Sequence, residues 1–171
     1  MNTTATETAD DARFSTFDGN AVADNYEIMQ PITFPPGIDP EATGALLAQG
    51  ADMRVVFCDP KAGLSLVRLR FAPDFKLVRH THDVDCLYYV VAGSLRMGNR
   101  TFEAGGGFFL PAHQPYGYEA GPDGVEVLEF RGATSFDMRI TETSPARWKA
   151  IADGVAANAE KWKALGFPTP A

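Results

Sequence analysis

The central part of the chain alternates between apolar and polar residues, which is the pattern of half-buried β-strands. The clearest case is LSLVRLRF at 64–71, where every second side chain belongs to the same face of a strand. Short runs of this kind recur along the chain, and the small glycine-containing pieces 92–94 and 98–99 are predicted hairpin turns. The predicted strands are 53–58, 64–71, 77–82, 86–91, 95–97, 100–102, 108–110, 116–118, 125–130 and 136–140.

Many short strands without helical segments between them predict an all-β protein built as an antiparallel sandwich or barrel. We assign this barrel to residues 28–141. Residues 1–27 are small, polar and acidic without periodicity, and they predict a flexible N-terminal arm. The segment 31–40 (PITFPPGIDP) has four prolines and is expected to be extended and irregular, and 41–49 is expected to form one short helical turn.

The last part of the chain changes to a helical period. Ser144 is suited to the N-cap and Pro145 to the first helical position, and Gly166 ends the pattern. Apolar residues at steps of three and four then predict an amphipathic helix over 144–166 that packs on the barrel or on a partner subunit. These residues are Trp148, Ile151, Ala152, Val155, Ala156, Ala159 and Trp162.

The composition fits one globular domain and excludes several classes of function. The chain has 171 residues, a mass of 18.5 kDa and a formal net charge of −7. Sequence-independent binding to nucleic acid or to an anionic membrane has no electrostatic basis in such a chain. We see neither a signal peptide nor a membrane-spanning run, and two cysteines allow no disulfide framework, so we expect a cytoplasmic protein. Cys58 is expected to be a small core residue.

The candidate chemistry begins with the histidines. The chain has three, and His80 and His82 form an H-x-H pair on a predicted strand, so that both imidazoles leave the same face. Two imidazoles at this spacing can reach one metal ion. The alternative is a pair of structural histidines, either solvated or hydrogen bonded to carbonyl groups.

The context of this pair resembles the first sequence motif of the cupin superfamily. That motif is a glycine, five residues, H-x-H, three or four residues, a glutamate, six residues and a glycine. His80, His82 and Gly93 match it, while Asp74 stands at the first glycine and Cys86 at the glutamate.

A second cupin motif follows after a short hairpin. It is a glycine, five residues, P-x-G, two residues, a histidine, three residues and an asparagine. Gly105 and Pro111 match it, whereas His113 replaces the second glycine, Tyr116 the histidine and Ala120 the asparagine. The resemblance covers residues 53–131 and implies a jelly-roll-like double-stranded β-helix barrel that forms a homodimer and holds a metal or small molecule inside.

The resemblance implies a small-molecule enzyme that binds one divalent transition metal, such as Fe, Zn, Mn or Ni, through His80 and His82. We expect a third ligand from Cys86, Asp85 or Tyr116, and a dioxygenase acting on a small apolar or aromatic substrate. A buried, non-ligating thiol is the alternative for Cys86.

The loss of the motif's glutamate and third histidine supports a second hypothesis: a metal-free isomerase, lyase or cyclase with histidine and tyrosine as acid and base. Its candidate catalytic residues are His113, in a loop between two prolines, and Tyr116 and Tyr118, which share a strand face. A third hypothesis is a small-ligand-binding cupin without catalysis. An inward-facing Arg68 or Arg70 would suit a carboxylate substrate.

Overall fold

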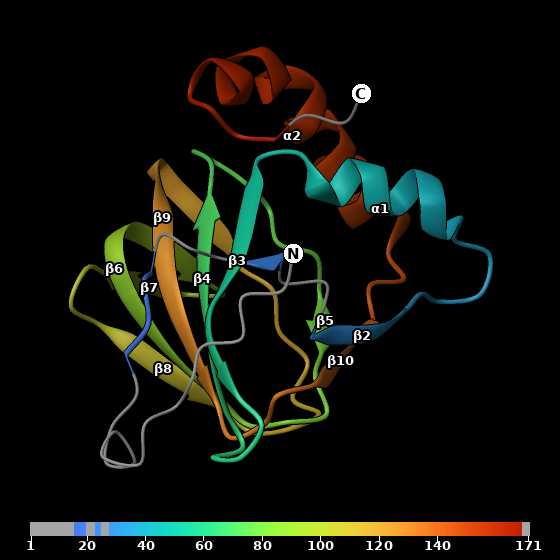
Figure 1. The fold of residues 1–171 in the computed structure, drawn as a ribbon. Helices are drawn as coiled ribbons and strands as arrows, with labels where there is room; N and C mark the ends of the chain where they lie inside the picture. The colour runs from blue at the N-terminus through green and yellow to red at the C-terminus, as the bar shows by residue number, and fades with distance from the viewer. Residues whose placement is uncertain (1–15, 20–22, 25–27, 169–171) are drawn as a thin grey trace, which may run out of the picture.

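The structure is a computed structural model that describes residues 16–19, 23–24 and 28–168. Most of the predicted N-terminal arm therefore lies outside the described residues. The described elements, labelled in Figure 1, are β1 (Ala23–Asp24), β2 (Met29–Thr33), α1 (Pro40–Ala48), β3 (Ala51–Asp59), β4 (Leu64–Phe71), β5 (His80–Thr81), β6 (Cys86–Met97), β7 (Arg100–Glu103), β8 (Gly107–Leu110), β9 (Glu119–Arg131), β10 (Phe136–Ile140) and α2 (Pro145–Ala164).

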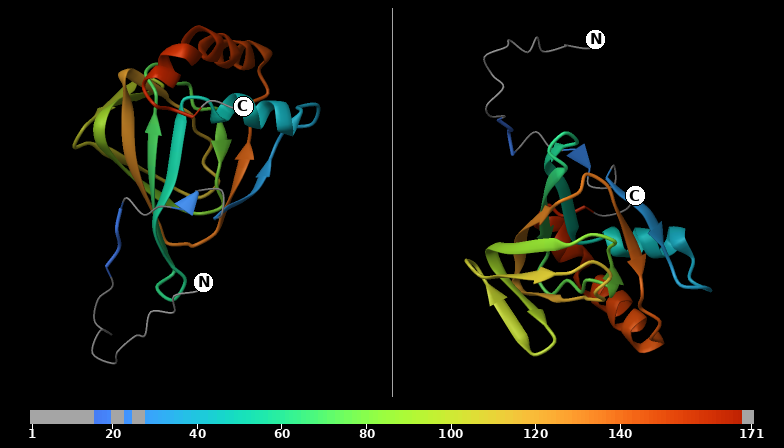
Figure 2. Two further views of the ribbon diagram at one scale, coloured as in Figure 1. Left: turned by 45° about the horizontal axis from the view of Figure 1, so that its top comes forward. Right: turned by 90° about the horizontal axis from the view of Figure 1, so that it is seen from below.

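The strands form two sheets, which lie on opposite sides of the molecule in Figures 1 and 2. The larger sheet has the order β1-β3-β4-β9-β6-β7, with β8 also paired to β6, and the smaller sheet has the order β2-β10-β5. All pairs are antiparallel except β2 with β10. The prediction of a mostly β fold with a C-terminal helix is confirmed.

The alternation read from the sequence determines which face of the large sheet is buried. On β4, Ser65, Val67, Leu69 and Phe71 are buried, and the face with Arg68 is not. Residues of β6 and β9 that lie in register with this face are buried too, and together they form the main core. Arg68 and Arg70, considered as inward partners for a carboxylate, belong to the opposite phase of the strand and do not face the core.

Several local predictions differ from the structure. The predicted strand at 116–118 is reduced to an isolated bridge between Tyr116 and His80. The predicted turn at 92–94 is part of β6, which continues to Met97 with register shifts against β9 on both sides of Ala92 and Gly93. Gly93 has φ +70°, and a Cβ there would lie 2.1 Å from the carbonyl oxygen of Gly124, so glycine is required for the close approach of the two strands. The proline-rich start of the barrel contains β2, which pairs with the distant β10.

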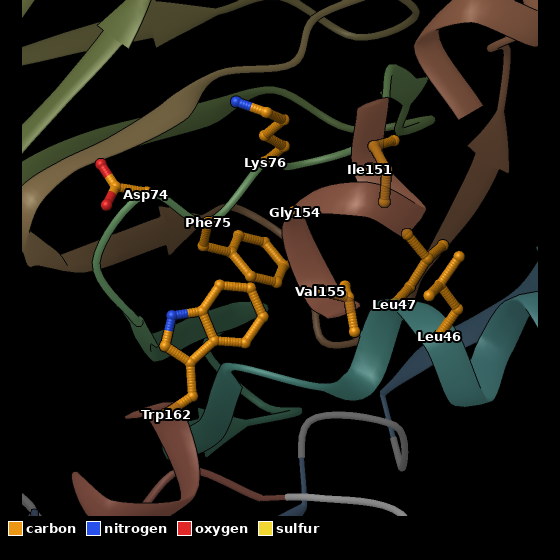
Figure 3. A pocket seen from close by; sticks show the side chains of 9 residues that line it. All are labelled: Leu46, Leu47, Asp74, Phe75, Lys76, Ile151, Gly154, Val155 and Trp162. Atoms are coloured by element: carbon orange, nitrogen blue, oxygen red, sulfur yellow. The ribbon is translucent and has the colours of Figure 1, made fainter. Parts of the chain in front are cut away.

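Helix α2 packs on one end of the barrel together with α1. The Trp162 indole is buried beside Phe75, with ring centroids 6.0 Å apart, and it donates a 2.9 Å hydrogen bond to the carbonyl of Pro73. Gly50 permits this contact, since a Cβ there would lie 2.5 Å from the indole. Around a small cavity, Figure 3 shows the apolar side chains that join the two helices: Leu46, Leu47, Ile151 and Val155.

Cys58 is exposed, so the prediction of a core residue is wrong. A register shift between Val55 and Phe57 changes the phase of β3 before Cys58. Among the described residues, no helix is long and apolar enough to cross a membrane.

Candidate functional site

A cluster of buried polar side chains lies inside the barrel, where the two sheets meet. The strands β5, β6 and β9 and the segment after β8 each supply at least one member. Polar groups are buried at high cost unless they are paired, so a cluster of this size is unusual for a structural core. Its members are His80, His82, Cys86, Tyr88, Tyr116, Tyr118, Glu129 and Arg131, and we call it the barrel cluster.

The two histidines are fixed by the backbone. His80 Nδ1 lies 2.8 Å from the carbonyl oxygen of Val78, and His82 Nδ1 is hydrogen bonded to the carbonyl of Asp137. A carbonyl oxygen only accepts, so each Nδ1 carries the proton and each neutral ring keeps its lone pair on Nε2. The two rings are 4.9 Å apart between centroids, which gives the site two basic nitrogens close together.

Both imidazoles are neutral at physiological pH. Burial, together with a smaller contribution from the neighbouring His82, lowers the pKa of His80 to about 3. Burial also lowers the pKa of His82 to about 4, with a second contribution from the positive charge of Arg131. Buried neutral rings of this kind accept a proton readily only after a negative charge enters the site.

Tyr116 joins the histidines to the rest of the barrel cluster. Its backbone exchanges two hydrogen bonds with His80, of 2.9 and 3.0 Å, and its ring lies 4.4 Å from the imidazole of His80. The hydroxyl groups of Tyr116 and Tyr88 share a hydrogen bond. Burial raises the pKa of both phenols well above 10, so both keep their protons at neutral pH.

Glu129 and Arg131 are functional candidates that the sequence analysis missed. They face the interior from β9 as a buried ion pair, in register with Tyr88 and Cys86 of β6. Burial raises the pKa of Glu129, and the Arg131 guanidinium opposes that shift. Strict alternation from the buried Val127 places Glu129 and Arg131 on the inner face of β9. The sequence alone does not identify that face, because Leu128 and Phe130 make the other face equally apolar.

Arg131 is incompletely paired. Its Nη2 donates to Glu129, and its guanidinium lies over the ring of Phe136 at 3.9 Å. Within the described part of the chain, Nε and Nη1 of Arg131 and the hydroxyl of Tyr118 are buried without a hydrogen-bond partner. An unpaired buried donor costs about 1–3 kcal/mol, and more when it is charged.

Two of the sequence-predicted site residues lie outside the barrel cluster. Asp85 is exposed, and its carboxylate accepts a 2.8 Å hydrogen bond from the backbone N–H of Ala112. His113 is exposed too, and only its backbone N–H reaches the site, with a 2.7 Å hydrogen bond to the carbonyl of His82. The other five candidates, His80, His82, Cys86, Tyr116 and Tyr118, are brought together.

The cupin glycine positions have the backbone conformation that glycine favours. Asp74 and His113, which replace glycines of the two motifs, have φ of +61° and +64°, and among the described residues no other side-chain-bearing position has positive φ. The two retained glycines, Gly93 and Gly105, have φ of +70° and +88°. The chain therefore keeps the turns of the motifs where it has lost their residues.

The donor set does not fit a resident divalent metal. Where the motifs place a glutamate, burial and the charge of Glu129 raise the pKa of the Cys86 thiol to about 12. At the position of the third histidine in the cupin motifs, Tyr116 has a protonated phenol whose hydroxyl is hydrogen bonded to that of Tyr88. The described residues contain no group of three His, Cys, Asp or Glu side chains arranged to hold a metal ion, and the positive Arg131 would oppose a second cation.

Comparison with known proteins shows a likeness of fold. The chain matches no protein-family model and no curated protein. It resembles the solved structure of KdgF from a Halomonas species at 26% identity over 48% of this chain and 81% of that one, with a TM-score of 0.42. An RmlC-like cupin from Shewanella frigidimarina matches at 22% identity over 48% and 76% of the two chains, with a TM-score of 0.43.

The polyketide cyclase RemF from Streptomyces resistomycificus is also similar, at 19% identity over 61% of this chain and 83% of that one, with a TM-score of 0.49. Two of the similar structures, from Shewanella frigidimarina and Ralstonia eutropha, are described as an RmlC-like cupin and as a protein with a cupin-like fold.

Proposed function

We propose that this chain is a metal-independent enzyme that moves protons on a small carbonyl compound, in the manner of an isomerase, lyase or cyclase. The observation that carries the proposal is the pairing of His80 with Tyr116, whose rings lie 4.4 Å apart in the buried cluster. His80 offers the lone pair of Nε2 as a base, and Tyr116 offers its phenol proton as an acid. Acid–base catalysis requires one group of each kind.

The chemistry would proceed by enolisation. The Nε2 atom of His80 takes a proton from a carbon beside the carbonyl group, and the phenol of Tyr116 donates to the carbonyl oxygen as negative charge develops there. Tyr88 supports Tyr116, because their hydroxyl groups share a hydrogen bond. His80 then returns a proton to the enolate, at the same carbon or at another carbon of a conjugated system, while Tyr116 keeps its own proton in a hydrogen bond to the oxygen, so the step needs no oxidant.

Deuterium exchange tests this proposal without knowledge of the substrate. Chelator-treated protein in D₂O is incubated with a panel of small ketones, β-diketones and 2-oxo acids, and wash-in of deuterium at the α-carbon is followed by proton NMR. We expect exchange on at least one probe, and a loss of about 100-fold or more in His80→Gln and Tyr116→Phe.

The matched control is Tyr89→Phe, because Tyr89 is the outward-facing neighbour of Tyr88 and is 46% exposed. It is expected to exchange at the wild-type rate. Exchange that disappears on chelation and returns with Fe(II), Zn(II), Mn(II) or Ni(II) would replace this proposal with the metal-dependent enzyme predicted from the H-x-H motif. Binding of probes without any exchange would reduce the protein to a small-ligand carrier. The homodimer and the cytoplasmic location remain predictions.

A further inference from the structure

Arg131 is the one described arginine whose side chain is fully buried while some of its N–H groups lack a hydrogen-bond partner. Its side chain is 1% exposed, and only Nη2 is occupied, by Glu129. The Nε and Nη1 groups have no hydrogen-bond partner among the described residues. A buried cation with free N–H groups is a built recognition site for an anion, because guanidinium geometry matches a planar carboxylate.

Arg131 and the histidine pair are close neighbours in the barrel cluster. The ring of Phe136 contacts both groups: the guanidinium lies over it at 3.9 Å, and the imidazole of His82 meets it edge-on at 5.2 Å between centroids. Tyr118 contributes one more unpartnered hydroxyl, and its ring centroid lies 6.4 Å from that of Tyr116. An anion held by Arg131 is thus within one small molecule's length of His82 and Tyr116.

The charges around the site favour a single negative group. The charge of Glu129 is already matched by Arg131, and the histidines and tyrosines of the barrel cluster are neutral. The remaining lining near Arg131 and Tyr88 is aromatic, with Phe136 and Phe108 in contact with these residues. A compact anion with an apolar or aromatic body fits these surroundings better than a strongly hydrated dianion.

We propose that the barrel cluster binds a small organic carboxylate, with Arg131 as the anchor of the carboxyl group and Tyr118 as a second donor. This inference names the substrate class for the site proposed above and rests on that proposal only for the chemistry that follows binding. With the carboxyl group on Arg131, the remainder of the ligand points to the imidazoles, so a 2-oxo acid is the expected substrate class.

The test measures binding separately from turnover. Phenylpyruvate and benzoate are titrated against wild-type protein by calorimetry, with benzamide as the uncharged analogue of benzoate and inorganic phosphate as the alternative anion. We expect the two carboxylates to bind at least about 10-fold more tightly than benzamide and phosphate, and benzoate to shift the side-chain Nε–H resonance of Arg131 in NMR spectra.

The variant Glu129→Gln/Arg131→Met removes both buried charges together, which avoids leaving a lone buried carboxylate. Its affinity for the carboxylates is expected to fall about 100-fold, whereas Arg70→Gln, on the outer face of β4, should bind as the wild type does.

Equal binding of benzoate and benzamide, preferential binding of phosphate, or an unmoved Arg131 resonance would overturn the inference. The wild-type NMR measurement decides the matter even if the double variant fails to fold. Tight carboxylate binding without deuterium exchange on any probe would uphold Arg131 as the anchor and defeat the proposed enzymatic function.

Discussion

At the residue scale, the two buried histidines make the stability of the fold depend on pH. Their folded pKa values of about 3 and 4 lie below the ordinary value of 6.5, so the unfolded chain binds protons first. The stabilisation that comes from the two neutral histidines is therefore fully present above pH 6.5. It decreases as the pH drops toward 4, which lowers the free energy of unfolding by up to about 1.4 kcal/mol per pH unit for each histidine.

Urea denaturation at pH 7, 6 and 5 measures this dependence. The variant His80→Gln/His82→Gln should show a shallower loss of stability, and His113→Gln, which changes an exposed imidazole, should follow the wild type. The raised pKa of Glu129 has the opposite effect on the pH dependence of stability, and Arg131 reduces that shift. Because all three proteins contain both residues, this effect does not change the comparison between them. Identical slopes in the wild type and the double variant would contradict this assignment.

The backbone at His113 offers a second residue-scale prediction. A φ of +64° is unfavourable for a residue with a Cβ, and the cupin motif has glycine at this position. His113→Gly is expected to raise the free energy of unfolding by about 1 kcal/mol, while His113→Ala, which keeps the strain, should give no gain. A destabilised His113→Gly protein would show that the exposed imidazole makes a contribution that outweighs the strain.

At the element scale, α2 is held to the barrel chiefly by Trp162. Its indole is 1% exposed, packs beside Phe75 and donates a hydrogen bond to Pro73. Trp162→Ala should therefore lower the free energy of unfolding by about 3–5 kcal/mol in chemical denaturation. Leu165→Ala, at the exposed end of the same helix, should change it little. If both substitutions have equal small effects, α2 does not contribute to the folding unit.

The sequence predicted elements where the signal is local and missed those that depend on distant partners. The hairpin at Gly98 and Asn99 follows from a two-residue turn, and Ser144 with Pro145 marks the start of α2. By contrast, β2 pairs with β10, more than a hundred residues away, and no local pattern records that contact.

The same distinction applies to the site. The H-x-H spacing correctly turns both imidazoles inward, with His80 at the start of β5 and His82 just after its end, and the motif positions bring Tyr116 beside them. Arg131 and Glu129 were not predicted, because β9 is apolar on both faces and its phase is decided only by pairing with β4 and β6. The inward arginine considered for β4 is instead supplied by β9.

At the scale of the whole molecule, the outer face of the large sheet carries a contiguous apolar surface. Leu87 of β6 lies in register with both Phe109 of β8 and Phe130 of β9, and these three side chains are 43–58% exposed. Tyr89 and Val91 of β6 are 46% and 42% exposed and extend this surface along the strand. Exposed apolar patches of several side chains often mark interaction sites.

We expect this surface to be the interface of the predicted homodimer. Leu87→Lys/Phe109→Lys should convert a dimer to a monomer in light scattering coupled to size-exclusion chromatography, because it places charges at the centre of the surface. The control, Leu64→Lys, changes an equally exposed residue at the end of β4 and should leave the mass unchanged. A monomeric wild-type protein at micromolar concentration would contradict the homodimer.

We propose that the Nε2 atoms of His80 and His82 are two free basic nitrogens that face a carbonyl substrate, rather than ligands of a metal ion. Long-range proton–nitrogen NMR on chelator-treated protein observes the four imidazole nitrogens directly. We expect a proton on Nδ1 and an unprotonated Nε2 in both rings at pH 7, with no change after one equivalent of Zn(II). Joint movement of both Nε2 resonances on stoichiometric addition of Zn(II) would contradict it.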